Sequence, residues 1–297
     1  MVGVPAMKLL ITGAAGFIGA HCVRYFASRG HDVTATDLAV GEGVLALDVS
    51  DPTAVRSMVS STRPQAILHL AALASVPKCE AEPETCWKTN LQGTVNMAEA
   101  ATDVGARIVF FSTAAVYGKP ELLPTPITAP VAPTNLYGLS KGGGELAVRG
   151  YAKDHVVLRL FNIYGEGCSR SYVIPDLILK LRSHEGELLL QGTGNESRDF
   201  LYISDLLRLI EAALSAPSGS LFNAGSGTTI TIKELATRVA RMAGRPDTTF
   251  RFSGPRAGDF PINFADISPG NVPPGWKPQV SLDEGVRRMI QEQAPPS

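Results

Sequence analysis

A glycine loop between a buried strand and a helix is the feature that most constrains the fold of this 297-residue chain. The apolar run 8–12 ends at Gly13, and Gly16 and Gly19 follow at three-residue intervals. Apolar side chains then recur at helical spacing until Gly30, a residue suited to end a helix. Glycines at this spacing let the backbone approach a pyrophosphate, and the helix N-terminus supplies free N–H groups. The loop therefore predicts a dinucleotide site.

Strand and helix patterns alternate along the first half of the chain. Short apolar runs predict further strands at residues 31–36, 44–47, 66–69, 107–111 and 156–160. Helical patterns lie between them, at residues 51–60, at 90–101 and around Tyr137. Alternation of this kind predicts an α/β fold, a doubly wound parallel sheet of the Rossmann type with helices on both faces.

The second half of the chain is less regular than the first. Proline and glycine become frequent between residues 243 and 278, which is typical of loops and short elements. We therefore expect a dinucleotide-binding domain over residues 7–165 and a smaller C-terminal α/β lobe over residues 166–297 that binds the substrate. The boundary is expected to be interleaved and is approximate.

Acidic residues follow the second and third predicted strands. Asp37 lies about 20 residues beyond the glycine loop, where a carboxylate hydrogen-bonds the ribose hydroxyls of a dinucleotide. A carboxylate there would repel a 2′-phosphate, so Asp37 favours NAD over NADP. Asp48 and Val49 are candidates to meet the adenine edge. The simpler alternative is that Asp48 is an ordinary acid at the start of a helix.

Tyr137 and Lys141 are four residues apart in a Tyr-Gly-Leu-Ser-Lys segment. On a helix they share a face, so the lysine can lie near the phenol and favour its ionised form. A phenol with an ordinary pKa near ~10 would thereby move towards working pH, where a general base is most useful. With a dinucleotide nearby, the pair predicts proton removal from an alcohol coupled to hydride transfer. The alternative is a surface pair on an ordinary helix.

Composition excludes several other classes of protein. The net charge is -1, with 27 basic and 28 acidic residues, and no basic run indicates nucleic acid or a membrane as a partner. No apolar run reaches the ~18 residues of a membrane span, and the N-terminus does not resemble a secretory signal. The cysteines lack metal-ligand spacing, so we expect no metal site and reduced, structural thiols in a cytoplasmic protein. They are Cys22, Cys79, Cys86 and Cys168.

Further motifs follow the glycine loop in a fixed order. They are His69–Ala72, Asn90–Thr94, Phe111–Gly118, Tyr137–Lys141, Arg159–Gly165, Gly192–Phe200, Arg256–Asp259 and Gly275–Pro278. Through them the chain, from Met7 to Pro278, resembles the extended short-chain dehydrogenase/reductase superfamily. More narrowly, it resembles the NAD-dependent nucleotide-sugar epimerase/dehydratase branch, which includes UDP-glucose 4-epimerase. The order and spacing of the motifs together make this resemblance specific.

The resemblance implies a role for each matching residue. Tyr137 would be the general base, and Lys141 would hold the nicotinamide ribose and lower the pKa of the tyrosine. The Thr113 hydroxyl would bind the reacting sugar oxygen, with Ser112 as its neighbouring alternative. The residues expected to contact NAD are Gly13, Gly16, Phe17, Ile18, Gly19, Asp37, Asp48, Val49, Leu70, Ala71, Ala72, Asn90, Ser112, Lys141 and Phe161.

Residues expected to bind the nucleotide sugar share the ability to recognise hydroxyls or a diphosphate. They are Thr113, Tyr137, Asn162, Arg198 and Arg256. The guanidinium groups of the two arginines are suited to clamp a diphosphate. The simpler alternatives are ion pairs of Arg198 with Asp199 or Asp205, and of Arg256 with Asp259.

The residues after Thr113 bear on the reaction. Dehydratases of this family have Asp-Glu there, and related decarboxylases have Glu at the second position, whereas this chain has Ala114 and Ala115. Alanine cannot transfer a proton, which argues against both activities. Epimerisation at C4 through a transient 4-keto sugar is favoured by Asp37. The alternatives are an NAD(P)H-dependent reductase of a 4-keto-6-deoxy sugar, which the stretch between residues 37 and 51 resembles, and a non-catalytic nucleotide-binding regulator.

The sequence says less about which nucleotide sugar is bound and about the oligomeric state. Residues 169–173 differ from the Asn-containing run of many 4-epimerases, so UDP-, dTDP-, GDP- and CDP-hexoses all stay open. The resemblance implies a homodimer formed through the helices at residues 90–101 and 137–151. The run 142–144 places three glycines inside the second helix, each costing about 1 kcal/mol relative to alanine. Either close packing or a locally weak helix would account for it.

Overall fold

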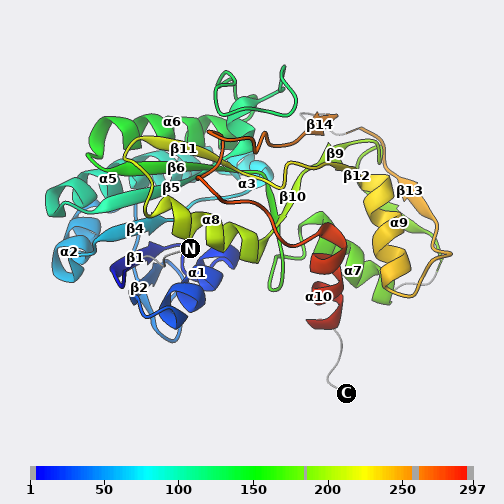
Figure 1. Ribbon diagram of the computed structural model, residues 1–297, viewed down its shortest axis with the longest axis horizontal. Coiled ribbons are helices and arrows are strands. Elements are labelled where there is room, and N and C mark those ends of the chain that lie inside the picture. Colours follow the sequence, from blue (N-terminus) through cyan, green and yellow to red (C-terminus); the bar gives the residue numbers. More distant parts are fainter. Residues whose placement is uncertain (1–4, 184–185, 256–260, 293–297) are drawn as a thin grey trace.

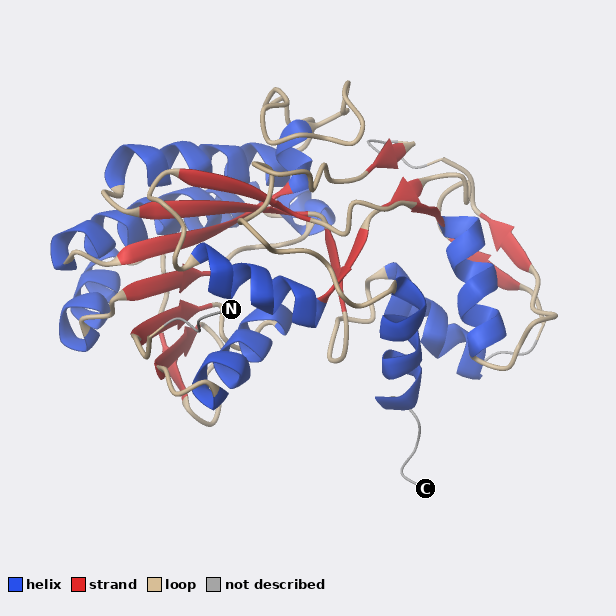
Figure 2. Cartoon of the chain, viewed as in Figure 1, coloured by secondary structure: helices blue, strands red, loops and turns tan. Residues whose placement is uncertain are grey.

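The computed structural model describes residues 5–183, 186–255 and 261–292. Seven parallel strands form its main sheet, in the order β11-β6-β5-β4-β1-β2-β3 (Figures 1 and 2). They are β1 (Lys8–Thr12), β2 (Asp32–Asp37), β3 (Val44–Ala46), β4 (Ala66–His69), β5 (Arg107–Thr113), β6 (His155–Leu160) and β11 (Ser220–Ala224). The predicted doubly wound parallel sheet is therefore confirmed, and β11 adds a strand that the sequence pattern did not indicate.

Helices cover both faces of this sheet (Figure 1). Successive strand side chains point to opposite faces: Leu10 of β1 packs with α2, α5 and α6, while Leu9 and Ile11 pack with α1 and α8. Because both faces are buried at the centre of the sheet, β1, β4 and β5 carry continuous apolar runs. These helices are α1 (Phe17–Ser28), α2 (Pro52–Thr62), α5 (Gly93–Val104), α6 (Leu136–Tyr151) and α8 (Ile203–Ala213).

The glycine loop lies where the order of the strands reverses. β1 pairs with β2 on one side and with β4 on the other, so the chain leaves the ends of β1 and β4 towards opposite sides of the sheet. Gly13 has a φ of 71°, and a Cβ there would lie 2.7 Å from the amide nitrogen of Ala71. Ligands of doubly wound sheets bind at such a switch point, so the fold places this loop at the expected binding crevice.

Short elements connect β4 to α5 and β5 to α6. They are α3 (Val76–Ala81), α4 (Pro83–Trp87), the π-helical turn η1 (Lys88–Gln92) and the 3₁₀ helix η2 (Ala114–Tyr117). The helix predicted at residues 90–101 is thus a π-helical turn followed by α5. Such turns are frequent at functional sites, and this one contains Asn90.

The remaining elements form a lobe beside the main sheet, at the right of Figure 1. They are β7 (Asn162–Tyr164), α7 (Val173–Ser183), β8 (Leu188–Leu190), β9 (Ser197–Arg198), β10 (Phe200–Tyr202), β12 (Ile230–Thr231), α9 (Ile232–Met242), β13 (Phe250–Phe252), β14 (Ile262–Asn263) and α10 (Leu282–Glu292). The strands pair into three small sheets. Since α8 and β11 return to the main sheet, the chain is interleaved here, and the domain boundary near residue 165 stays a prediction.

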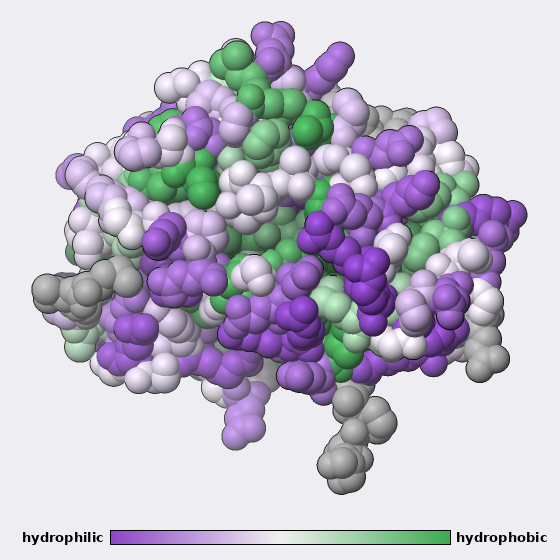
Figure 3. All heavy atoms as spheres, turned by 45° about the vertical axis from the view of Figure 1, so that its right-hand side comes forward, coloured by the Kyte–Doolittle hydropathy of each residue, from purple (hydrophilic) through white to green (hydrophobic). Residues whose placement is uncertain are grey.

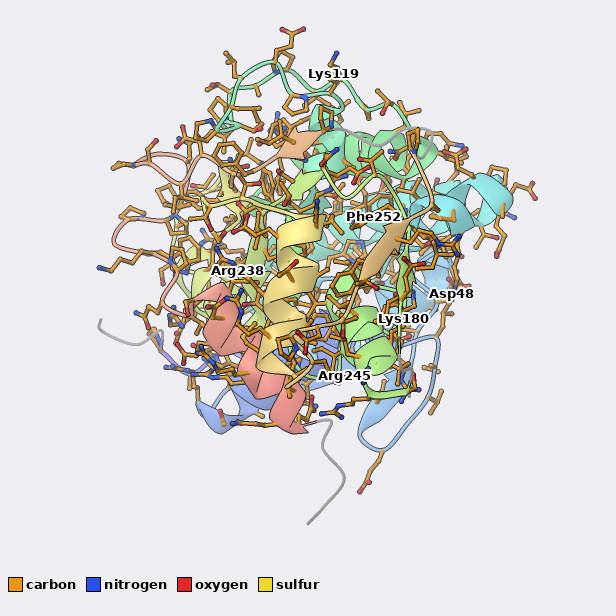
Figure 4. All side chains as sticks on the ribbon, turned by 90° about the vertical axis from the view of Figure 1, so that its right-hand side faces the viewer. Asp48, Lys119, Lys180, Arg238, Arg245 and Phe252 are labelled. Atoms are coloured by element: carbon orange, nitrogen blue, oxygen red, sulfur yellow. The ribbon has the colours of Figure 1, made fainter. Side chains whose placement is uncertain are left out.

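Polar contacts join the helices of this lobe. Figure 4 labels Arg238 on α9 beside α10, where its Nη1 lies 3.7 Å from Oδ1 of Asp283. Figure 3, in which the lobe comes forward, shows a mosaic of hydrophilic and hydrophobic side chains, as is ordinary for a protein surface. Among the described residues, no helix has the length and apolar character to cross a membrane.

The three consecutive glycines of α6 have different surroundings. A Cβ at Gly144 would lie 2.6 Å from Cζ of Phe110 and 3.3 Å from the carbonyl oxygen of Asn90. A Cβ at Gly143 would lie 3.2 Å from Leu91, whereas at Gly142 the nearest atom would be 3.6 Å away. Close packing of α6 on β5 and η1 therefore accounts for Gly144, and it does not account for Gly142.

This difference predicts opposite effects of two alanine substitutions. Gly144→Ala should destabilise the protein by about 1–2 kcal/mol, because overpacking at the Phe110 ring exceeds the gain in helix propensity. Gly142→Ala should stabilise it by up to ~1 kcal/mol, since its Cβ makes only ordinary contacts. Urea unfolding of both variants measures the difference. Equal effects would mean that α6 shifts freely on β5.

Candidate active site

Two predicted catalytic hydroxyls meet at the carboxyl end of β5. Thr113 ends this strand and caps η2, since its Oγ1 accepts a hydrogen bond from Ala115 N at 3.2 Å. Tyr137 lies in the first turn of α6, whose N-cap Asn135 accepts a bond from Gly138 N at 2.8 Å. The Thr113 side chain interacts with the Tyr137 phenol and lowers its pKa. The pair can therefore bind one substrate oxygen and move a proton.

The pKa values differ from the prediction made for Tyr137. Burial raises the pKa of Tyr137, and the nearby Thr113 side chain offsets this only in part. Lys141 does not lower the pKa below its ordinary value in this structure. Its Nζ lies 4.2 Å from the centre of the Phe110 ring, and burial lowers the pKa of Lys141 to about 7, with Glu145 acting in the opposite direction. At neutral pH only about half of such lysines are charged, which weakens their pull on the phenol.

Lys141 is 2% exposed, and its charge acts on His69 at the end of β4. The His69 ring lies between two hydroxyls, with Nδ1 2.9 Å from Thr12 Oγ1 and Nε2 3.2 Å from Thr94 Oγ1. Burial, with a smaller contribution from Lys141, lowers the pKa of His69 to about 3. The imidazole is therefore neutral at physiological pH and cross-links β1, β4 and α5.

The depressed pKa of His69 predicts how stability depends on pH. The unfolded chain binds a proton at this histidine near pH 6.5, whereas the folded protein binds it only near pH 3. Stability from this group is therefore full above pH 6.5 and falls with acidification towards pH 3, by up to ~1.4 kcal/mol per pH unit. His69→Gln should flatten this loss in urea unfolding between these pH values. His155→Gln is the control, and an unchanged slope in His69→Gln would contradict the assignment.

The predicted cofactor loop has the features that a dinucleotide requires. The N-cap of α1, Gly16, makes no side-chain capping bond, which leaves the first N–H groups of the helix to a ligand. A Cβ at Gly19 would overlap the carbonyl oxygen of Gly13. Asp37 lies beside this loop, with Oδ2 2.9 Å from Ala15 N and Oδ1 3.1 Å from Ala39 N. These residues fit a pyrophosphate and a ribose.

The loop after β4 completes the predicted cofactor surface. Leu70 N donates to Thr12 O at 3.3 Å, Ala71 N donates to Thr12 Oγ1 at 3.2 Å, and Ala72 follows directly. The buried Asn90 side chain accepts from Leu73 N at 2.7 Å. It therefore holds the loop from beneath, which is a positioning role that the sequence did not indicate.

The other predicted cofactor residues differ in exposure and in hydrogen bonding. Phe17 and Ile18 form the first turn of α1 and are half-buried. Phe161 and Val49 are buried. Asp48 is exposed and accepts hydrogen bonds from the Ser50 amide and hydroxyl, whereas Asp51 provides the N-cap of α2. Asp48 is therefore not the acid that starts this helix.

The predicted substrate residues extend into the second lobe. Asn162 Nδ2 donates to Asp199 O at 2.8 Å, and Arg198 Nη1 donates to Ser197 O at 2.9 Å.

The Asp199 carboxylate accepts bonds from Ser226, Gly227 and Ala265. The Asp205 carboxylate is engaged by Arg208, Gln279 and Val280. Both alternative partners of Arg198 thus have other hydrogen bonds. Arg256 and its alternative partner Asp259 lie outside the described residues.

A buried ion pair behind the hydroxyl pair was not predicted. Glu145 accepts bonds from Arg159 Nε at 2.9 Å, Arg159 Nη2 at 2.7 Å and Ser112 Oγ at 2.6 Å. Ser112 thus points to Glu145 and away from Thr113. The sequence feature that could have indicated Glu145 is its spacing, since it lies four residues beyond Lys141 on the same helix face. In the described part of the chain, no group of three or more metal-ligating side chains is present.

Comparison with known proteins agrees with this geometry. The model of the "NAD dependent epimerase/dehydratase family" matches residues 9–225. The UDP-glucose 4-epimerase of Mycolicibacterium smegmatis is 30% identical, covering 96% of this chain and 98% of that protein. The UDP-glucuronic acid decarboxylase 1 of Danio rerio is 31% identical, and the match covers 96% of this chain and 72% of that protein.

A solved structure extends the likeness to three dimensions. The UDP-glucose 4-epimerase of Thermotoga maritima with UDP-glucose superimposes with a TM-score of 0.87 at 29% identity, covering 96% of this chain and 98% of that one. The family match covers the sheet, the glycine loop and the Thr113–Tyr137 pair. The chain belongs to the NAD-dependent epimerase/dehydratase family, and NAD is its cofactor.

Proposed function

We propose that the protein inverts the configuration at C4 of a nucleotide-diphosphate sugar through a transient 4-keto sugar. The observation that carries this proposal is the Thr113–Tyr137 hydroxyl pair at the carboxyl end of β5, with alanines in the two positions that follow. The glycine loop and Asp37 would hold NAD, which would supply a hydride acceptor at the sugar C4 and the same hydride for its return. Turning the keto sugar over between these two events inverts C4.

The chain's own side chains handle the proton. Thr113 orients the sugar 4-hydroxyl, and Tyr137 takes its proton as the carbonyl forms and gives it back in the second half. Because burial raises the pKa of Tyr137, the phenol needs a cation beside it to act as a base. We assign that part to Lys141, which with a pKa of about 7 is available in the charged form at and below neutral pH.

Ala114 and Ala115 separate this proposal from dehydration and decarboxylation. Relatives at about the same identity are a 4-epimerase and a decarboxylase, so identity does not choose between them. Ala114 is 6% exposed and opens η2 directly after Thr113. Methyl groups at these positions cannot protonate or deprotonate a sugar, whereas epimerisation needs no acid or base beyond Thr113, Tyr137 and Lys141.

The nucleotide sugar would bind between the two parts of the chain. We assign NAD to residues 7–165 and the sugar nucleotide to residues 166–297, with Asn162 and Arg198 near the diphosphate. A relative named for UDP-glucose and a similar structure holding UDP-glucose favour UDP-hexoses as the first substrates to test. dTDP-, GDP- and CDP-hexoses form the comparison set.

NMR of the protein with NAD and this panel, without reductant, tests the proposal. An inverted sugar with no net NADH supports it and identifies the substrate. NADH or NADPH oxidation only with a 4-keto-6-deoxy sugar nucleotide would replace it with reduction. Binding of NAD and sugar nucleotide without turnover of any of these substrates would favour a regulatory role.

We also propose that the protein is a cytoplasmic homodimer that pairs through α6. Leu139 is 47% exposed and Leu146 is 69% exposed, and they lie seven residues apart on this helix. An exposed apolar stripe of this kind is suited to pairing with a second helix. Leu146→Glu should convert a dimer to a monomer in sedimentation velocity, and a wild-type monomer at micromolar concentration would refute the proposal.

A further inference from the structure

Two buried thiols lie in contact beneath the predicted cofactor surface. Cys79 on α3 and Cys86 on α4 are both 0% exposed, and their sulfur atoms are 2.7 Å apart. This is closer than the ~3.5–4.0 Å usual for non-bonded carbon atoms in contact. Both are free cysteines. A buried cysteine is ordinarily an inert apolar residue, but here the fold presents two sulfurs to each other.

We propose that Cys79 and Cys86 form a reversible disulfide, and that closing it weakens the binding of NAD. Reversible disulfides in reducing compartments are usually catalytic or redox-sensing. The effect on NAD does not depend on which sugar the enzyme converts. The test of this effect is therefore independent of the proposed epimerisation.

The oxidant is a peroxide, and the reaction balances with hydrogen peroxide. One thiol sulfur attacks a peroxide oxygen, the O–O bond breaks, and a sulfenic acid and one water form. The sulfur of the other thiol then attacks the sulfenic sulfur, so that the S–S bond forms and the S–OH bond breaks to release a second water. Two thiols are oxidised, one peroxide is reduced, and a small dithiol restores the pair by exchange.

Burial sets the rate of this chemistry. It raises the pKa of Cys79 to about 12, so the unreactive thiol predominates at neutral pH. Access to the sulfurs comes from local opening of α3 (six residues) and α4 (five residues). Short elements of this kind open at lower free energy than the core of a sheet. A small oxidant such as peroxide is therefore the class that can reach the pair.

Hydrogen bonds connect the pair to the cofactor loop. Cys79 Sγ donates to Leu73 O at 3.3 Å, and Asn90 Nδ2 also donates to this oxygen at 3.3 Å. Leu73 directly follows the Leu70–Ala72 segment that packs on Gly13. Disulfide formation removes the S–H donor and draws α3 and α4 together, so it loosens the loop on which the dinucleotide is expected to lie.

A second connection leads to the catalytic helix. Cys86 Sγ lies 3.5 Å from Ser140 Oγ, and Asn90 Nδ2 bonds the same hydroxyl at 2.9 Å. Ser140 precedes Lys141, the residue assigned to the nicotinamide ribose. Oxidation therefore changes the hydrogen bonds of two segments that flank the cofactor.

Mass spectrometry and NAD titration of the full chain test the proposal. Trypsin releases residues 79–88 as one peptide containing both cysteines. After treatment with hydrogen peroxide, removal of peroxide by catalase and alkylation of remaining thiols, this peptide should be unalkylated and lighter by two hydrogens. The Kd for NAD should rise about fivefold, as expected from losing one hydrogen bond worth ~1 kcal/mol, and dithiothreitol should restore it.

Two variants complete the design. Cys86→Ser should abolish both the mass change and the effect of peroxide on NAD binding, whereas Cys168→Ser, which retains both members of the pair, should preserve them. Oxidation of the peptide only to sulfinic acid, or linkage only in urea, would overturn the proposed bond. A disulfide that forms in the folded protein without changing the Kd for NAD would overturn the coupling.

Discussion

Replacing Tyr137 by Phe should lower kcat by about 10²–10⁴-fold, the range expected for loss of a general acid–base group. The aromatic ring, the start of α6 and the glycine loop all stay in place, so NAD binding should be unchanged. Thr113 loses its hydroxyl partner and can no longer pass the sugar proton to an acceptor. Steady-state kinetics and NAD titration of the same preparation measure both quantities.

Tyr151→Phe is the matched control for this substitution. Tyr151 ends the same helix and is 51% exposed, so removing its hydroxyl should leave kcat unchanged. Near-normal turnover in Tyr137→Phe would show that another group moves the proton. Loss of NAD binding together with turnover would show instead that Tyr137 serves the cofactor.

Replacing Glu145 by Gln should destabilise the fold by about 3–5 kcal/mol, because it leaves the buried Arg159 guanidinium without its counter-charge. The two side chains are 3% and 2% exposed and share two hydrogen bonds. Denaturant unfolding at neutral pH measures the loss. The exposed pair Glu234–Arg238 is the control, since Glu234→Gln should cost at most ~1 kcal/mol.

A double variant separates the missing charge from the missing contacts. Combining Glu145→Leu with Arg159→Met removes both charges and keeps the site filled, so it should recover most of the stability lost in Glu145→Gln. A double variant no more stable than the single one would mean that the pair itself stabilises the fold. A loss below ~1 kcal/mol in Glu145→Gln would contradict the assignment of a desolvated pair.

The main sheet was largely predictable because its strands are buried on both faces. Continuous apolar runs bounded by glycine or polar residues marked β1 and β4 with the bounds that the structure has. The strand β11 was missed because it returns to the sheet from the irregular second half, by pairing with β6. Such pairing over long sequence separation leaves no local periodicity.

The sequence predicted where the catalytic residues lie better than it predicted their pKa values. Sequence spacing indicated that Tyr137 and Lys141 lie on one helix, as they do in α6. It did not indicate that burial would lower the pKa of Lys141 to about 7 or raise that of Tyr137, because desolvation depends on tertiary packing. The Cys79–Cys86 contact was missed for the same reason, since it depends on how α3 and α4 pack.

The fate of the hydrogen at C4 shows whether one hydride leaves the sugar and returns to the same carbon. The protein is incubated with NAD and UDP-glucose deuterated at C4, without reductant, and the products are followed by NMR. We expect a sugar inverted at C4 that keeps its deuterium, with no accumulation of NADH. An inverted sugar carrying solvent hydrogen at C4, or a 4-keto-6-deoxy product, would contradict the proposed epimerisation.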